Sequence, residues 1–231
     1  MAAALILDRL LGEPPPALHP VAAFGRSLGA LERGAYRDSK AAGVGFWIAG
    51  VSSATLAGRA LAGGRDGHRG AAAAMLATTT AVAGRALARA AASVDESLAR
   101  GDLSEARHRL PALVGRDPAG LGEAEMVRAV VESVAENTVD AVVAPAMWGV
   151  AAGAAGTLGY RAVNTLDAMV GHRGQRYERF GWASARADDV ANWLPARLTA
   201  ALVTLVRPAA VRGIWRAVLD DAPAHPSPNA G

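Results

Sequence analysis

Carboxylates recur at helical spacing in the segment between residues 123 and 140. Glu125, Glu132, Glu136 and Asp140 are separated by seven, four and four positions, so they share one narrow stripe of a helix. Carboxylates four residues apart repel each other by about a few tenths of a kcal/mol. The stripe therefore needs either arginines from another helix or a Mg²⁺ ion held by carboxylates and a substrate phosphate. The spacing alone favours neither.

A second group of polar residues lies between residues 160 and 197. Arg186, Asp189 and Asn192 recur every three positions and can share one face of a helix. Arginine suits phosphate because its guanidinium is a forked donor. His172 falls in a predicted loop, where it is either an acid–base group or a solvent-exposed bystander. Both polar groups crowd against the ends of an apolar segment, which is the layout of a site at a membrane surface.

The apolar segment 141–160 decides whether the two polar groups can meet. It carries no charge but is interrupted by Pro145 and four glycines. A straight helix of this length rises about 30 Å and places Asp140 and Asp167 on opposite sides of a bilayer. A re-entrant hairpin brings them to the same side, provided that protein covers its exposed backbone. A single site that uses both groups requires the hairpin.

Other apolar segments predict a membrane protein. Residues 41–58 carry no charge over eighteen positions, which is enough for a spanning helix, although a buried helix of a soluble bundle is the alternative. Residues 71–84 form a marginal span that ends at Arg85, and residues 198–206 span only if they extend back through Asn192. We expect an all-α, polytopic helical membrane protein with roughly three to five membrane-embedded helices and charged cytoplasmic helices and loops.

The charged segments are expected outside the lipid. Residues 86–109 predict one charged, amphipathic helix, and residues 63–70 predict a basic loop. Because positive loops stay in the cytoplasm, we place the 63–70 loop there. Asp8 and Arg9 interrupt the first apolar run, so no cleavable signal peptide is expected.

Composition excludes several classes of protein. Hydrophobic residues make up 52% of the 231 residues and aromatic residues only 5%, and this alanine-rich content favours helices. The chain has no cysteine, which excludes thiolate metal ligands. The net charge is only +3, and no basic run with interleaved aromatics suggests nucleic acid as a partner. No GxxxxGK[ST] motif occurs, so a nucleotide would not bind to a P-loop.

Motifs spread over nearly the whole chain resemble one known family. They are LDRLLGEPP at 7–15, HPVAAFGR at 19–26, VGRDPAGL at 114–121, VESVAENTVDAVVAPAMW at 131–148, the polar stretch at 160–200 and HPSPNAG at 225–231. The set is similar to the CobD/CbiB family of cobalamin biosynthesis, the membrane-bound adenosylcobinamide-phosphate synthases. Glu13 stands where the family usually has Asp, which keeps the charge. Because family members continue past HPSPNAG, we expect the single domain 1–231 to be incomplete at its C-terminus.

The resemblance implies an amide-forming ligase. Such an enzyme joins the propionate of adenosylcobyric acid to the amine of aminopropanol or of its O-phosphate, with ATP and Mg²⁺. It also implies a multi-pass protein of the cell membrane whose active site faces the cytoplasm, in contact with the lipid bilayer and with other cobalamin-pathway membrane enzymes, and without a nucleic-acid partner. A corrinoid transporter or delivery component without ligase activity is the first alternative, and a soluble helical interaction protein is the second.

Roles follow from the resemblance for the polar residues at the matching positions. The expected catalytic residues are Glu132, Glu136, Asn137, Asp140, Asn164 and Asp167, and the expected Mg²⁺ ligands among them are Glu136, Asp140 and Asp167. The expected substrate- or phosphate-binding residues are His19, Arg161, Arg173, Arg186, Asp189, Asn192 and Arg197. The arginines would neutralise the phosphates, and the asparagines would hydrogen-bond the peripheral amides of the corrinoid.

Overall fold

The computed structural model describes all residues except 13–18, 64–66, 116, 173, 222–227 and 230–231. The described chain is helical and contains no strand, which confirms the all-α prediction. Three π-helical segments of the described chain, η2 (Val139–Val143), η3 (Asp167–Gly171) and η5 (Ala217–Asp221), continue α-helices. The α-helices are α1 (Ala2–Leu11), α2 (Pro20–Ala35), α3 (Lys40–Ala62), α4 (His68–Ala81), α5 (Gly84–Ala99), α6 (Leu103–Arg109), α7 (Glu123–Thr138), α8 (Ala144–Leu166), α9 (Trp182–Val206) and α10 (Val211–Arg216).

Within the described residues, three helical stretches are long and apolar enough to cross a membrane. They are Lys40–Ala62, His68–Ala99 and Glu123–Gly171, and a fourth is added if Trp182–Val206 and Pro208–Asp220, bent by 114°, form one span. This agrees with the predicted number of membrane-embedded helices. The expected loop at 63–70 is shorter than predicted, since α4 already begins at His68, directly after Gly67 with its positive φ of 100°.

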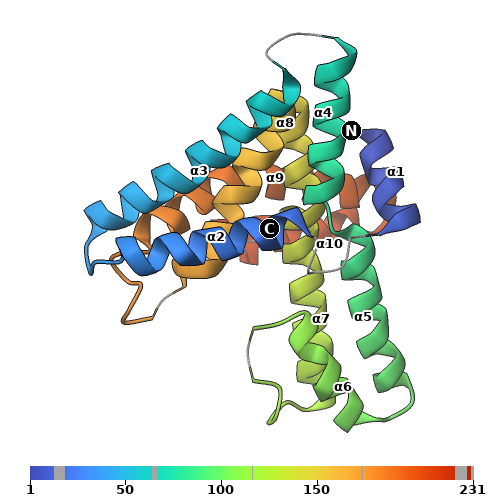
Figure 1. Cartoon of the computed structure of the whole chain (residues 1–231). Coiled ribbons are helices and arrows are strands. Elements are labelled where there is room, and N and C mark those ends of the chain that lie inside the picture. Colours follow the sequence, from blue (N-terminus) through green and yellow to red (C-terminus); the bar gives the residue numbers. More distant parts are fainter. Residues whose placement is uncertain (13–18, 64–66, 116, 173, 222–227, 230–231) are drawn as a thin grey trace.

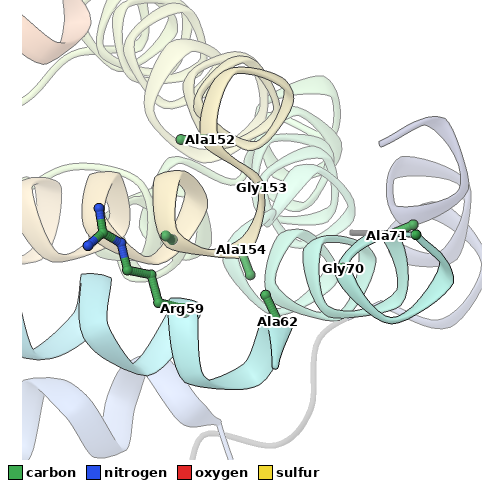
Figure 2. A pocket seen from close by; sticks show the side chains of 10 residues that line it. Arg59, Ala62, Gly70, Ala71, Ala152, Gly153 and Ala154 are labelled. Carbon is green, nitrogen blue, oxygen red and sulfur yellow. The ribbon is translucent and has the colours of Figure 1, made fainter. Parts of the chain in front are cut away.

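The third stretch doubles back on itself within α8. Ala152 (φ −141°, ψ 22°) and Gly153 (φ 60°, ψ −146°) leave the helical region, and Gly153 takes a conformation that other residues rarely adopt. Thr157 Oγ1 then donates to the carbonyl oxygen of Pro145 at 3.4 Å, and Tyr160 Oη lies 3.4 Å from the carbonyl oxygen of Asp140. Both pairs straddle the break, so 141–160 is a hairpin and not a straight helix. Figure 2 shows Gly153 in the connection between the two arms.

Without η3, the returning arm of the hairpin is shorter than the hydrocarbon layer of a bilayer is thick. This arm, Ala154 to Leu166, rises about 18 Å, against about 30 Å of hydrocarbon. Helix α3 covers this arm with small residues: a Cβ at Gly58 would lie 2.6 Å from the carbonyl oxygen of Ala154, and a Cβ at Gly50 2.9 Å from Leu166 Cδ1. Such close approach supplies the protein cover that a re-entrant backbone needs.

Helices α5, α6 and α7 form a lobe that extends away from the helices around α8 (Figure 1). Its core consists of Val94, Ala106, Leu110, Met126 and Ala129. The single charged helix expected at 86–109 is two helices, because the chain turns at Gly101 with a positive φ of 73°. Helix α7 runs on through η2 into α8, so the lobe and the hairpin share one continuous helix.

A second core, of Leu28, Phe46, Leu166, Val170 and Phe180, joins α2, α3, the end of α8, η3 and the 174–181 loop. The loop is also tied to α2 by polar contacts. Tyr177 Oη donates to Glu32 Oε1 at 2.7 Å, and Tyr36 Oη donates to the carbonyl oxygen of Arg176 at 2.8 Å. The hydrogen bond to Glu32 raises the pKa of Tyr177 above its ordinary value, and burial adds a smaller increase.

Candidate functional site

Asp140 occupies the wide turn η2, at the base of the hairpin. Its Oδ2 accepts a hydrogen bond from Asn164 Nδ2 at 3.1 Å, and its Oδ1 lies 3.5 Å from Tyr160 Oη. Asn164 in turn accepts from Arg161 Nη1 at 3.2 Å. The outgoing arm therefore supplies the carboxylate, and the returning arm supplies the phenol, the amide and the guanidinium. The hairpin brings together residues 24 positions apart in the sequence.

Helix α9 completes this cluster from the other side. Asn192, only 3% exposed, accepts from Tyr160 Oη at 2.8 Å and donates through Nδ2 to Asp188 Oδ2 at 2.9 Å. A network thus runs from Asp140 through Tyr160 and Asn192 to Asp188. Asp188 is a residue that the sequence prediction missed. The available signal was its position four residues before Asn192, which puts both on the same helix face.

The cluster is strongly acidic. Asp188 and Glu136 lie close enough to Asp140 to repel its negative charge. Asp167 is repelled in the same way by Asp188, Asp189 and Glu136. Arg161 is a cation that faces Asp140. The structure therefore brings Glu136, Asp140, Asn164, Asp167, Arg161, Asp189 and Asn192 of the predicted set into one region.

The donor set fits Mg²⁺ only together with a substrate. Among the residues that the structure describes, no three histidine, aspartate or glutamate side chains are arranged to hold an ion by themselves. Asp188 Oδ1, however, is buried without a hydrogen-bond partner at normal geometry, although Asn164 is near. Mg²⁺ is commonly held by one or two carboxylates, with phosphate oxygens and water completing its shell. The expected ligands Glu136, Asp140 and Asp167, joined by Asp188, have the right chemistry for that arrangement.

Two predicted catalytic residues on α7 form contacts within their own helix. Glu132 accepts from Arg128 Nε at 2.7 Å on the exposed side of the helix. Asn137 Nδ2 donates to the carbonyl oxygen of Ser133 at 2.9 Å, within its own helix. The carboxylate stripe is thus divided between a surface ion pair and the cluster.

The remaining predicted binding residues lie around the cluster or away from it. Arg186 pairs with Asp189 at 3.2 Å, and Arg197 stacks on Trp193, with its guanidinium carbon 4.1 Å from the ring centre. His19 caps α2, where its Nδ1 accepts from the amide of Val21 at 3.2 Å. Arg173 and Glu13 lie outside the described residues.

His172 is exposed and packs edge-to-face on Tyr177, with ring centres 4.9 Å apart. Among the residues that the structure describes, no contact places it in the cluster, so the structure favours the bystander interpretation. An open pocket of about 520 Å³ lies at the hairpin tip, between Arg59, Gly70 and Ala154 (Figure 2). Glycine and alanine line most of it, and the acidic cluster lies at the other end of the hairpin.

Comparison with known proteins identifies the family. The chain matches the family described as CobD/Cbib protein over residues 1–231. The chain belongs to the CobD/CbiB family. The cobalamin biosynthesis protein CobD of Mycobacterium tuberculosis (strain ATCC 25618 / H37Rv) is 47% identical over 98% of this chain and 73% of its own length. The protein of the same name from Geobacter metallireducens is 45% identical over 99% of this chain and 74% of its own length. No solved structure matches this chain.

The resemblance inferred from the motifs is thereby confirmed, and membership supports a role in cobalamin biosynthesis. In this CobD/CbiB chain, the base of the hairpin, η3 and the start of α9 come from the two longest matching motifs, at 131–148 and 160–200, whereas the hairpin tip lies between those motifs. The acid–amide cluster is therefore the region in which those motifs meet.

Proposed function

We propose that this chain is an ATP-dependent, amide-forming ligase of cobalamin biosynthesis. It would join the propionate of adenosylcobyric acid to the amine of aminopropanol or of its O-phosphate, giving cobinamide or cobinamide phosphate. Family membership supports the pathway. The observation that carries the proposal is the return of the α8 hairpin, which places Asp140 against Asn164 and next to Asp188 and Asn192 of α9.

The proposed chemistry needs charge compensation at a phosphate. A carboxylate is a poor electrophile, so transfer of the γ-phosphoryl group of ATP to it gives an acyl phosphate and ADP. The amine then attacks the acyl carbon, phosphate leaves, and the nitrogen loses a proton as the amide forms. Preorganised cations and hydrogen-bond donors around the phosphoryl group lower both barriers.

The cluster contains residues for each of these tasks. One or two of the carboxylates of Asp140, Asp167 and Asp188 would hold Mg²⁺ together with the phosphates, and the ion would neutralise phosphate charge when it is bound. Arg161 and Arg186 would bind phosphate oxygens through their forked guanidinium groups. Carboxylates that are not engaged with the metal would accept the proton of the attacking amine. The amides of Asn164 and Asn192 would orient these carboxylates or meet the corrinoid amides.

We place the cluster at the cytoplasmic face of the cell membrane, where ATP is available. Helix α3 runs from Gly43, packed on the carbonyl of Phe180 beside the cluster region, to Gly58 at the hairpin tip. If α3 spans the membrane, the cluster and the 63–70 loop lie on opposite sides, so they cannot both be cytoplasmic as expected. Basic residues are equal in number in the sequence at the two ends of α3, with Arg33, Arg37 and Lys40 at the cluster end and Arg59, Arg65 and Arg69 at the other, so the chosen orientation rests on the need for ATP.

Ligation by the purified, detergent-solubilised chain tests the proposal. With ATP, Mg²⁺, adenosylcobyric acid and aminopropanol phosphate, mass spectrometry should detect cobinamide phosphate and ADP. Asp140→Asn should lower turnover by at least about 10²-fold with membrane insertion unchanged. Asp95→Asn, the same change at an exposed position of α5, is the matched control and should retain wild-type turnover. Equal turnover of the two variants would remove Asp140 from the mechanism.

The phosphate role has its own test. Arg186→Lys keeps the charge but loses the fork, so the KM for aminopropanol phosphate should rise by about 10-fold. The KM for unphosphorylated aminopropanol should not change. An equal rise for both amines would contradict phosphate recognition by Arg186.

Transport is a second candidate function because broken, re-entrant helices also form transport sites. Its specific support is the interruption at Ala152–Gly153. Corrinoid uptake into proteoliposomes without ATP-dependent ligation would favour this function over the enzyme.

A further inference from the structure

Helices α1 and α5 cap each other at the break between α4 and α5. Asp8 is 5% exposed, and its Oδ2 accepts from the backbone amide of Arg85 at 3.0 Å, in the first turn of α5. The N-cap residue of α5, Ala83, has no side chain that could do this. In return, Arg85 Nη1 donates to the carbonyl oxygen of Arg9 at 2.8 Å and to that of Leu10, at the end of α1. The N-terminal helix thereby fixes the position at which α5 begins.

The same break is hydrogen-bonded to η2. The amide of Ala83 donates to the carbonyl oxygen of Ala141 at 2.9 Å. Val82 ends α4 in an extended conformation, so the amide of Ala83 lies outside the hydrogen-bond ladder of either helix. Ala141 adjoins Asp140 in the sequence. A path of direct contacts therefore leads from Asp8 to the start of α5, across to Ala141, and to the cluster carboxylate.

Gly84 permits this approach of three segments. A Cβ at this position would lie 3.1 Å from Asp8 Oδ2 and 3.3 Å from Val142 Cγ2, tighter than most real contacts of a Cβ atom. The start of α5 is thus in close contact with α1 on one side and with η2 on the other.

We infer that Asp8 is a positioning residue for Asp140: by capping α5 it holds the Ala83–Ala141 hydrogen bond and, through it, the π-helical turn that carries the carboxylate. The inference rests on the proposed function, in which Asp140 holds Mg²⁺ with ATP. Residues that orient a metal-binding carboxylate change metal affinity by about 10–100-fold when they are removed. Asp8 makes no contact with the cluster itself in the described structure, so its effect is exerted through the backbone.

The experiment compares Asp8→Ala, Asp8→Asn and a matched control in the full chain reconstituted in lipid nanodiscs. Asparagine still accepts a backbone hydrogen bond and caps helices about as well as aspartate. Asp102→Ala is the control, since Asp102 Oδ1 caps α6 by accepting from the amide of Glu105 at 2.9 Å, in the lobe. Two quantities are measured: the Mg²⁺ concentration for half-maximal ligation, and hydrogen exchange of peptides covering 82–86 and 139–143.

Asp8→Ala should raise the half-saturating Mg²⁺ concentration by about 10–100-fold and speed exchange in both peptides. Asp8→Asn should stay within about 3-fold of the wild type, and Asp102→Ala should leave both quantities unchanged in this region. If Asp8→Asn is as impaired as Asp8→Ala, the capping role is overturned, because the negative charge of Asp8 is then what matters. Unchanged exchange at 139–143 in Asp8→Ala would overturn the coupling.

Failure of the proposed function is recognised separately. If the wild type does not ligate while Asp8→Ala still speeds exchange at 139–143 and Asp102→Ala does not, the positioning of the turn is supported and the ligase is refuted. If Asp8→Ala does not accumulate, Asp8→Asn and Gly84→Ala carry the test. Gly84→Ala should speed exchange at 139–143, because its Cβ pushes Val142 and Asp8 apart, and unchanged exchange in Gly84→Ala would count against the inference.

Discussion

Replacing Gly156 by alanine would force the two arms of the α8 hairpin apart. A Cβ at this position would overlap the carbonyl oxygen of Trp148 and would lie 3.0 Å from its carbonyl carbon and 2.9 Å from Ala152 Cβ. Carbon atoms pack at about 3.5–4.0 Å, so the arms must separate by about 0.5–1 Å. The arms share the cluster, in which Asn164 Nδ2 and Asp140 Oδ2 are 3.1 Å apart. The same separation would take this hydrogen bond to about 3.6–4.1 Å, beyond its useful range.

The expected cost has two parts. Overpacking of this kind destabilises a protein by about 1–3 kcal/mol, even though alanine itself favours the helix by about 0.5–1 kcal/mol over glycine. Misplacement of Asp140 by such a distance should lower turnover by about 10²-fold. Apparent thermal stability in detergent and ligation of aminopropanol phosphate measure the two effects.

The matched control is Gly45→Ala in α3. Nothing lies within 4 Å of a Cβ at Gly45, so this variant should be as stable and as active as the wild type, or slightly more stable. If Gly156→Ala behaves like Gly45→Ala in both assays, the arms are not in contact, and the argument for one site at the base of the hairpin fails.

Two hydrogen bonds give further predictions. Tyr160→Phe leaves Asn192 Oδ1 without its 2.8 Å donor in a buried position, so it should cost about 1–3 kcal/mol in unfolding free energy and lower turnover; unchanged values of both would deny the network a role. Tyr177 has a raised pKa because of its hydrogen bond to Glu32, so the protonated phenol stabilises the fold below about pH 10 and this contribution is lost as pH rises through the higher folded pKa. The melting temperature, measured from pH 8 upward, should therefore fall less steeply with pH in Tyr177→Phe than in the wild type. Parallel curves for the two proteins would contradict a stabilising role for the protonated phenol.

The lengths of the uncharged, apolar segments were the most informative feature of the sequence. The uncharged run 41–58 predicted α3, and the stretch 141–160 required a hairpin if one site was to use both polar groups. Which glycine makes the turn was not predictable, because Gly149, Gly153, Gly156 and Gly159 occur in similar local sequence. Only the packed structure shows that Gly153 has a positive φ, while Gly156 permits the arms to touch.

Individual site residues were less predictable than the region. The three-residue repeat selected Asp189, whereas Asp188 is bonded to Asn192, because a helix brings positions four apart together equally well. The carboxylate stripe assumed that each acid faces the same partner, but Glu132 forms an ion pair with Arg128 on its own helix. Both contacts join residues four apart in one helix, so the sequence allowed them without showing which of the allowed pairs would form.

The π-helical turns η2 and η3 make the site sensitive to the deletion of a single residue. Asp140 lies within η2 and Asp167 begins η3, and such wide turns arise when one extra residue is accommodated in an α-helix. Deleting a single residue from either turn would restore regular winding and rotate the following helix by about 100°. The segments that follow, which are the returning arm after η2 and the loop after η3, would then turn different side chains toward the cluster. Conservative substitutions are thus a smaller threat to this centre than a one-codon deletion.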